Sequence, residues 1–600
     1  MSLKMDDIKT KTIETNGEIN CDKSSVSKST SDSRIACGAC LRLWRSWLPI
    51  GYKEEIVEVV KLAGPVVISQ LMIYLISFIS AVFCGHLGKV ELAGVSLAIA
   101  VINVTGISIG AGLASACDTL ISQTFGSNNL KRVGIILQRG ILILLLACFP
   151  CWAILINTEA ILLAVRQDPA VAKLSQLYVK IFMPALPAAF MYQLQGRYLQ
   201  NQGIIWPQVF TGIAGNIVNV LANYILLYVL DLGVAGSAAS NAIAQFSLAV
   251  FLFAYIVWRG LHMKTWGGWS VQCLQEWDTF INLAIPSMLM LCLEWWTYEI
   301  GSFLAGLIGE VELGAQSIAY QMGSISYMFP LGFSVAASVR VGNALGAGKT
   351  AQAQLSGKVA VVCAAIVSCF VALTIGNLKN VIGYIFTNDT EIVARVKDVM
   401  VLYASFHLFD CMAGVTGGIV RGAGKQAIGA VCNLVGYYFI GLPIGASLMF
   451  AAHLGIIGLW VGFLFCAFMQ ALFFIIFLVK LNWKKTTQEA LIRAGAQPSA
   501  DAEESAAEQG PALDKLGSSQ ALTLEGQECE GFSSGSSRDL ERLSGDGGEA
   551  EDGDQQARSA AGQVLSIRQL VLRRLLVTFG MLLLLAAGIT CSILLPPLLK

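Results

Sequence analysis

Long apolar segments alternate with short polar ones along most of the chain. A membrane-spanning helix needs about 20 mostly apolar residues, and the segments of this kind fall into groups of six, six and one. They cover residues 56–84, 90–122, 132–156, 172–198, 206–230 and 235–258, then 278–307, 312–344, 355–378, 394–420, 427–450 and 455–480, and finally 570–599. The pattern predicts an all-α polytopic membrane protein with two six-helix bundles and a C-terminal thirteenth transmembrane helix.

Polar segments divide the chain into further parts. We expect a disordered cytoplasmic N-terminus, a first bundle (the N-lobe), a cytoplasmic linker, a second bundle (the C-lobe), an acidic disordered cytoplasmic segment and the last helix. Residues 486–566 are rich in Ala, Gly, Ser, Gln and acids, which is typical of disorder. The first 45 residues lack a signal-peptide pattern, so the first apolar helix is expected to target the chain. The predicted parts are 1–50, 51–258, 259–277, 278–480, 481–567 and 568–600.

The two halves of the chain resemble each other at a nearly constant offset. Because each half has an even number of spans, both enter the bilayer from the same side, which predicts a parallel repeat about an axis along the membrane normal. Such an architecture is typical of carriers, although a repeat alone does not prove transport. Gly88–Ser96 matches Gly309–Ser317, Gln123–Gly126 matches Asn343–Gly346, and Leu232–Gly236 matches Leu454–Gly458, at offsets of 221, 220 and 222.

Basic residues in the short loops predict the orientation, because they concentrate on the cytoplasmic side. That side is expected to carry the N-terminus, and an odd number of spans then puts Lys600 outside, in a multi-pass protein of the plasma membrane. The sequon at Asn388 would face outward, where it is either glycosylated or an unused chance match. The richer side holds Lys131, Arg132, Arg259, Lys264, Lys349, Lys358, Arg421, Lys425, Lys480, Lys484 and Lys485.

Composition narrows the class of protein. Hydrophobic residues make up 55% of the 600 residues and charged residues only 13%, too few to cover several soluble domains. The net charge of zero argues against a nucleic-acid binder. This zero is the sum of a net charge of −11 in residues 501–560 and a net charge of +11 in the rest of the chain. An acidic segment is therefore attached to a basic, mostly apolar body.

One local pattern suggests a chemistry that the sequence does not support. Asn343–Thr350 approaches a nucleotide-binding P-loop, but Asn343 stands where glycine must turn the loop, so we expect no ATP binding. Four scattered histidines and the absence of an HExxH motif predict no metal site, and we expect no enzyme. Cys37 and Cys40 are either unmodified cytosolic thiols or sites of S-acylation.

Four acids lie well inside apolar segments: Asp118, Glu294, Glu299 and Asp410. A carboxylate at that depth is costly unless it is paired, hydrated or protonated, which makes such a group a candidate for reversible protonation. Each has an alternative role as a hydrogen-bonded structural acid. That alternative is strongest for Asp118, which lies near a cytoplasmic helix end.

Aromatic residues surround Glu294. Tyr298 follows it by four positions and shares its helix face, whereas Glu299 lies more than a quarter turn away. Tyr320, Gln321 and Tyr327 add polar character to the next span. Aromatic faces with a carboxylate suit a bulky organic cation, although Trp295 and Trp296 also fit an aromatic belt at the lipid interface.

Together these segments resemble the multidrug and toxin extrusion (MATE) family, and the thirteenth helix and the Glu-Trp-Trp sequence resemble its vertebrate, proton-coupled organic cation antiporters. The resemblance covers about residues 50–480. It rests on the two lobes and on Cys117–Gln123, Glu294–Glu299, Arg340–Asn343 and Gly436–Gly445.

The resemblance implies a V-shaped fold that alternates between inward-open and outward-open states. Glu294, Glu299 and Asp410 would be the coupling acids, with Tyr298, Tyr320 and Gln321 beside them. Gln70, Asn103 and Asp118 would line the N-lobe cleft. Two departures from relatives stand out: Ser80 replaces an acid of prokaryotic members, and Gln321 and Asp410 stand where animal members often have Glu.

These observations favour electroneutral exchange of one inward proton for one outward organic cation at Glu294. The expected partners are small organic cations, protons and the lipid bilayer, without ATP, nucleic acid or metal. The proton gradient would replace any cofactor, and the functional unit would be a monomer. A sodium-coupled or lipid-flipping carrier of the same fold is the first alternative, and a non-transporting receptor or scaffold acting through residues 486–566 is the second.

Overall fold

The computed structural model describes residues 51–85, 87–496 and 567–594. The chain divides into a unit Met1–Lys53 and a unit Glu54–Lys600, and the following description concerns the second unit. Cys37, Cys40 and most of the two segments predicted to be disordered lie outside the described residues, so those predictions stay open.

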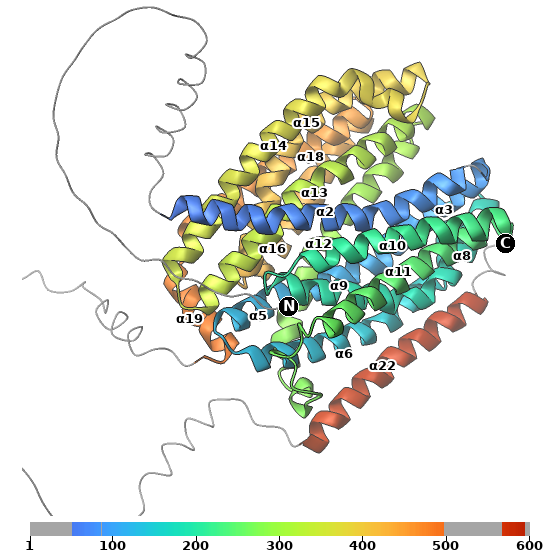
Figure 1. The fold of residues 1–600 in the computed structure, drawn as a ribbon. Coiled ribbons are helices and arrows are strands. Elements are labelled where there is room, and N and C mark those ends of the chain that lie inside the picture. Colours follow the sequence, from blue (N-terminus) through green and yellow to red (C-terminus); the bar gives the residue numbers. More distant parts are fainter. Residues whose placement is uncertain (1–50, 86, 497–566, 595–600) are drawn as a thin grey trace, which may run out of the picture. The chain divides into compact units, whose positions relative to one another are not determined.

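The described part contains thirteen helices long and apolar enough to span a membrane, which confirms the predicted fold class (Figure 1). The N-lobe elements are α2 (Tyr52–Gly85), α3 (Lys89–Ile102), η1 (Asn103–Ile107), α4 (Ser108–Ala114), α5 (Ala116–Gly126), α6 (Leu130–Leu155), α7 (Thr158–Ala164), α8 (Pro169–Phe182), η2 (Met183–Ala185), α9 (Leu186–Gln200), α10 (Trp206–Tyr224), η3 (Ile225–Val229) and α11 (Gly233–Trp258).

The linker contains one short turn, and the C-lobe and two further helices follow it. These elements are η4 (Val271–Leu274), α12 (Trp277–Gly306), α13 (Glu310–Gly346), α14 (Thr350–Phe386), α15 (Thr390–Gly422), α16 (Gln426–Asn433), η5 (Leu434–Gly441), α17 (Leu442–Phe450), α18 (Ile456–Lys480), α19 (Trp483–Ala494) and α22 (Ile567–Leu594).

Matching backbone conformations support the parallel repeat. Gly88 before α3 has φ 162° and ψ 168°, and Gly309 before α13 has φ 163° and ψ 172°. Asp168 and Asp389, 221 residues apart, each cap a helix by accepting hydrogen bonds from the second and third amides that follow. An N-cap carboxylate satisfies amides that have no partner within the helix. Equivalent positions of the two halves thus begin equivalent helices.

The lobes meet where α5 crosses α13. A Cβ at Gly126 would collide with the backbone of Asn343, and a Cβ at Gly346 would collide with the backbone of Gln123. Gly126 and Gly346 are equivalent in the repeat, as are Gln123 and Asn343. The two contacts are therefore reciprocal and related by the axis of the repeat, and the absence of side chains at both glycines lets the backbones approach.

Each lobe contains an apolar core, and the core of the N-lobe extends to the first turns of α12. In the N-lobe, large buried side chains such as Phe182, Phe190 and Tyr198 lie among helices α4 to α11. In the C-lobe, Trp460 of α18 packs edge-on against Tyr403 and Phe406 of α15, with ring centroids 5.4 and 5.5 Å apart. These cores make α12, α13, α15 and α18 a fixed frame for the polar side chains described below.

Helix α19 differs from the sequence prediction, which assigned residues 481–567 to a disordered segment. The Asn482 side chain accepts a hydrogen bond from the Lys485 amide at 3.0 Å and caps the helix. Thr486, Ala490 and Ala494, spaced by four residues, form a buried face. Helix α19 packs on α5, α13 and α14. The low hydrophobicity of the whole segment concealed this short helix, whose contacts use small residues.

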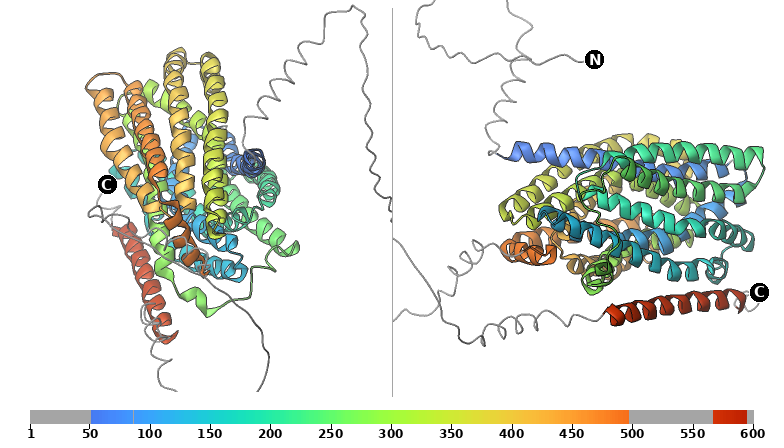
Figure 2. Two further views of the ribbon diagram at one scale, coloured as in Figure 1. Left: turned by 90° about the vertical axis from the view of Figure 1, so that its left-hand side faces the viewer. Right: turned by 60° about the horizontal axis from the view of Figure 1, so that its bottom comes forward.

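The thirteenth helix, α22, lies along α6 (Figures 1 and 2). The Asn157 side chain donates a hydrogen bond to the Gly588 carbonyl at 2.9 Å. At its other end, the Arg574 guanidinium lies 4.1 Å from the Trp277 ring centroid and donates to the Leu274 carbonyl at 3.0 and 3.2 Å. The helix therefore contacts both the N-lobe and the linker that joins the lobes.

Candidate functional site

Two carboxyl groups meet inside the C-lobe. Glu294 of α12 and Asp410 of α15 lie close enough to interact electrostatically, and Asp410 is only 5% exposed. Tyr327 of α13 lies within electrostatic reach of the Glu294 carboxyl group. Three helices thus contribute polar groups to one region, which we call the acid cluster (Glu294, Asp410 and Tyr327).

Aromatic rings surround the acid cluster. Tyr298, one turn after Glu294 on α12, interacts with both acids. Its ring centroid lies 5.5 Å from that of Phe463 and 6.2 Å from that of Tyr320. Ring faces carry partial negative charge, so they attract cations as the carboxylates do.

Two of the surrounding tyrosines were missed in the sequence analysis. Tyr403 precedes Asp410 by seven residues on α15, which puts both on one helix face, and Tyr437 belongs to the π-helical turn η5. Both are 2% exposed and lie within electrostatic reach of Asp410. The two-turn spacing is a signal that could have identified Tyr403, whereas nothing in the local sequence directs Tyr437 toward the acids.

A second polar group lies closer to the predicted extracellular end of α12. The Tyr320 hydroxyl donates a hydrogen bond to Glu299 at 3.3 Å. The neighbouring Gln321 accepts a hydrogen bond from Tyr74 of α2, which joins the C-lobe to the N-lobe. The structure thus places Glu299, Tyr320 and Gln321 in one region of α12 and α13, and the Tyr298 ring contacts that of Tyr320 in a tilted arrangement.

Among the described residues, no hydrogen bond or ion pair joins the N-lobe residues Gln70, Asn103 and Asp118 to one another, and their place in a common cleft stays a prediction. Gln70 on α2 and Asn103 at the start of η1 are half-buried. Asp118 is 2% exposed and forms an ion pair with Arg197 at 3.0 Å and a hydrogen bond with Asn201 at 3.3 Å. Its contacts match the structural alternative considered for this residue.

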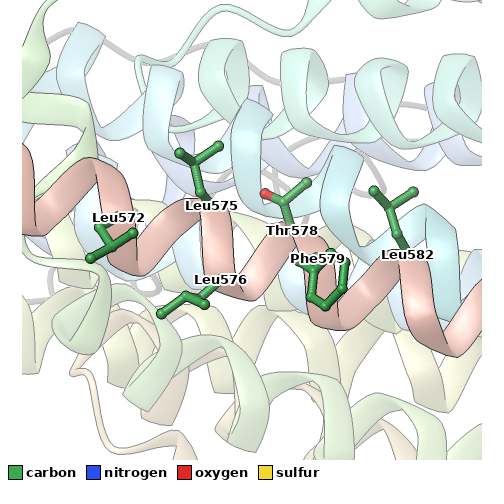
Figure 3. A pocket seen from close by; sticks show the side chains of 6 residues that line it. All are labelled: Leu572, Leu575, Leu576, Thr578, Phe579 and Leu582. Carbon is green, nitrogen blue, oxygen red and sulfur yellow. The ribbon is translucent and has the colours of Figure 1, made fainter.

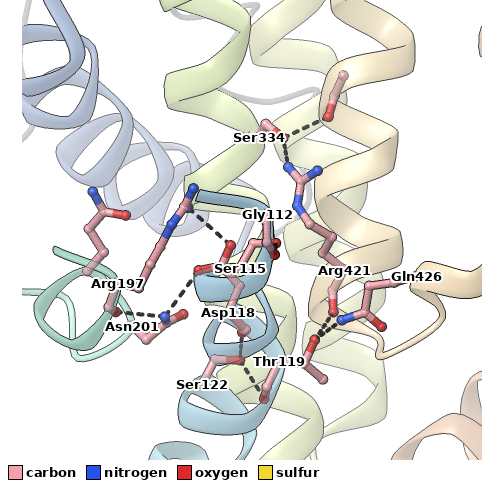
Figure 4. A network of polar contacts seen from close by, with 12 residues as sticks. Gly112, Ser115, Asp118, Thr119, Ser122, Arg197, Asn201, Ser334, Arg421 and Gln426 are labelled. Atoms are coloured by element: carbon pink, nitrogen blue, oxygen red, sulfur yellow. Dashed lines mark hydrogen bonds and ion pairs between the residues drawn. The ribbon is translucent and has the colours of Figure 1, made fainter. Parts of the chain in front are cut away.

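Asp118 belongs to a polar network that joins the lobes near their predicted cytoplasmic ends, and Figure 4 shows this network. We call it the inter-lobe network: Asp118, Thr119, Arg197, Arg421 and Gln426. Thr119 of α5 donates to the Arg421 carbonyl at 2.6 Å, and the Gln426 side chain donates to Thr119. From the sequence, Arg421 served only as a basic loop residue that indicates orientation. Its place in this network could not be predicted, because its partners Thr119 and Ser334 are distant in the sequence.

The buried and half-buried acids of the helices differ in whether they have a basic partner. Glu55, Asp118 and Glu312 form ion pairs with Arg340, Arg197 and Arg395 at 2.5, 3.0 and 2.7 Å. By contrast, Glu294, Glu299 and Asp410 have no ion-pair partner within 4.0 Å among the described residues. Three membrane-embedded carboxyl groups of the C-lobe therefore remain available to a proton or to a cation.

Two surface hollows are described in the structure, and neither is lined by Glu294, Glu299 or Asp410. One is formed by the side chains of α22 (Figure 3), and the other lies on α10 and α11; both are almost wholly apolar. No group of three or more metal-ligating side chains occurs in residues 51–85, 87–496 and 567–594.

The sequence of the chain matches that of a known protein family. The model of the MatE family matches residues 65–225 and 286–446, two segments separated by the offset of the internal repeat. The chain belongs to the MATE family. Its members are multidrug and toxin extrusion transporters, so the protein is a transporter rather than an enzyme.

Several relatives of this MATE protein match over most of their length. Multidrug and toxin extrusion protein 1 of Danio rerio is 66% identical over 96% of this chain and 97% of its own. The human protein of the same name is 57% identical over 76% and 79%. The crystal structure of the eukaryotic MATE transporter AtDTX14 is 30% identical, with a TM-score of 0.72 over 74% of this chain and 100% of that one.

Proposed function

We propose that this MATE protein exports organic cations by exchange for protons, with the acid cluster of the C-lobe as the exchange site. The observation that supports the proposal is that the buried Asp410 and the half-buried Glu294 have no basic partner and lie beside tyrosine rings, with the half-buried, equally unpaired Glu299 farther along α12. A dry site of this kind stabilises a monovalent cation by charge pairing and by cation–π attraction. It also favours the neutral acid when no cation is present.

Competition for one carboxyl group couples the two flows. When Glu294 is ionised it pairs with the cation, and when it is protonated its attraction for the cation disappears. By linkage, the cation lowers proton affinity by the same factor by which the proton lowers cation affinity. One proton entering for each monovalent cation leaving moves no net charge, and the proton gradient drives the exchange without a cofactor or ATP.

Alternating access requires two arrangements of the lobes. The inter-lobe network, the reciprocal glycine contacts and the pair Glu55–Arg340 hold the lobes together near the ends where the basic loops lie. We assign this arrangement to a state closed toward the cytoplasm. The N-terminus would be cytoplasmic, Lys600 extracellular, and the protein a monomer in the plasma membrane.

The test is flux of tetraethylammonium in proteoliposomes that carry the purified full-length protein. An acidic compartment on one side should drive tetraethylammonium uptake into that compartment. Glu294→Gln should abolish this response, while Glu310→Gln, which removes an exposed acid of α13, should leave it unchanged. Full pH-driven exchange by a correctly folded Glu294→Gln protein would refute the assigned site.

The alternatives give different results in the same vesicles. A sodium-coupled carrier would respond to a sodium gradient at constant pH, and a lipid-flipping carrier would move a labelled lipid but not tetraethylammonium. A receptor or scaffold would support neither flux. Each of these outcomes would overturn the proton-exchange proposal.

A further inference from the structure

Helix α19 is fixed to the C-lobe along its first two turns. Only residues 481 and 482 separate it from α18, so the chain itself holds it beside that helix. The hydroxyl groups of Thr487 and of Thr350, the first residue of α14, are hydrogen-bonded at 2.7 Å. Glu489 forms an ion pair at 2.6 Å with Lys425, which lies between α15 and α16. These three connections make α19 a part of the C-lobe.

The last turn of α19 contacts the N-lobe instead, and Figure 1 shows the helix beside α5. Arg493 Nη1 donates a hydrogen bond to the Gln123 side chain of α5 at 2.9 Å. The side chain of Asn129, which lies between α5 and α6, donates to the Ala494 carbonyl at 3.3 Å. The final carbonyls of a helix have no partner within it, so Asn129 satisfies one of them. Helix α19 therefore connects the two lobes.

Arg493 lies where the lobes meet. Gln123, which accepts its hydrogen bond, also donates to the Gly422 carbonyl of the C-lobe at 2.9 Å. A Cβ at Gly424 would overlap the Arg493 guanidinium, which therefore fills the space that a side chain at this glycine would need. Arg493 Nη2 lies 3.6 Å from Glu489, and the arginine side chain is only 16% exposed. The bond between α19 and Gln123 is thus largely shielded from water.

We propose that α19 is a latch between the lobes and that Arg493 is the positioning residue that holds it closed. The inference rests on the proposed function, because it assumes that the lobes separate at their cytoplasmic ends during exchange. Opening there carries Gln123 away from the C-lobe, while the contacts of its first two turns keep α19 on that lobe. The two bonds of its last turn, to Gln123 and Asn129, therefore break at each opening and form again at each closure.

The charge of Arg493 determines how strongly the latch holds. Lys425 lies 2.6 Å from Glu489 and Arg493 lies 3.6 Å from it, so the lysine supplies most of the pairing with this acid. The guanidinium remains available as a charged donor to Gln123. Loss of a hydrogen bond with one charged partner changes an equilibrium by about tenfold or more. The latch therefore favours the closed arrangement and raises the substrate concentration needed for entry from the cytoplasm.

The experiment compares Arg493→Gln, which removes the charged donor, with Arg493→Lys, which keeps a charge at this position. Asn129→Ala removes the second contact from the N-lobe side. Lys484→Gln is the matched control, because Lys484 is an exposed base in the first turn of α19. Deuterium uptake of the full-length protein is measured at the end of α5 and in the last turn of α19. Tetraethylammonium flux in proteoliposomes of known orientation gives the KM for entry from the cytoplasmic side.

In Arg493→Gln, deuterium uptake at both places should accelerate about tenfold, and the cytoplasmic KM should fall by a similar factor. Asn129→Ala should move both quantities in the same direction, Arg493→Lys should stay closer to the unsubstituted protein, and Lys484→Gln should change neither. Faster uptake within α19 alone, with an unchanged KM in folded Arg493→Gln, would overturn the inference. Absence of proton-driven flux in the unsubstituted protein would instead overturn the proposed function, and deuterium uptake, which requires no transport, would still test the latch.

Discussion

The ion pair between Glu55 of α2 and Arg340 of α13 allows the closed arrangement of the lobes to be tested quantitatively. Glu55 is 4% exposed and accepts hydrogen bonds from Arg340 Nε at 2.8 Å, from Arg340 Nη2 at 2.5 Å and from the Ser356 hydroxyl at 2.7 Å. Glu55→Gln removes the negative charge and leaves a guanidinium that is only partly hydrated.

Breaking a buried pair by neutralising one partner costs about 3–5 kcal/mol. The Arg340 side chain is 23% exposed, so the low end of that range, about 3 kcal/mol, applies. If the pair exists only when the cytoplasmic ends are closed, this cost shifts the ratio of closed to open protein by on the order of 100-fold.

A cysteine introduced by Asn343→Cys reports the change, because Asn343 lies in the contact with α5. Its reaction with a membrane-impermeant maleimide from the cytoplasmic side, measured by mass spectrometry of the labelled peptide, should accelerate strongly in Glu55→Gln. The neighbouring Glu54 is exposed, and Glu54→Gln should not change the rate. Glu55→Gln combined with Arg340→Gln should label more slowly than Glu55→Gln, because it leaves no unpaired charge. An equal labelling rate for Glu55→Gln and the parent protein would refute the reasoning.

Two further predictions concern peripheral helices. Gly588→Leu should undock α22, because even a Cβ would lie 2.7 Å from the Cα of Ala153. In detergent solution the proteolysis of α22 should then accelerate, while tetraethylammonium exchange in proteoliposomes is retained. An unchanged cleavage rate would contradict the packing. Burial raises the pKa of Glu489, but the hydrogen bond and charge of Lys425 outweigh it and hold that pKa below the ordinary 4.5. The stabilising contribution of Glu489 is therefore present above pH 4.5 and lost as the pH falls through its lowered pKa, so α19 should resist proteolysis from pH 5 to 8 and lose protection below that window. In Glu489→Gln the protection should be weaker from pH 5 to 8 and should not fall further below that window.

Much of the fold was predictable from the sequence because the bilayer constrains it. Apolar length identified the spans, and three anchor segments identified the repeat. The interruptions of the spans could not be predicted in the same way. The π-helical turn η1 in the second span and the turn η5 in the eleventh change the backbone hydrogen-bonding pattern without ending the span, so apolar length does not reveal them.

The candidate site was predictable only in part. Glu294 and Asp410 could be identified because they lie deep in apolar segments. A carboxylate there is costly unless it is paired, hydrated or protonated. The partners of these acids depend on how helices pack. Tyr437 reaches them from a segment more than 100 residues away from Glu294. The ion pair of Asp118 was equally hidden, because Arg197 lies on a helix that the sequence did not connect with α5.

The reciprocal contacts of Gly126 and Gly346 have the form of an isologous interface, in which the same patch contributes twice across a two-fold axis. Each half of the chain supplies one glycine and one backbone segment. Two identical halves would make the same contact with each other as these two unequal halves do. The crossing of α5 and α13 therefore has the form of a dimer interface within a single chain. Substitutions elsewhere in either half leave this backbone contact between the lobes intact if both glycines are retained.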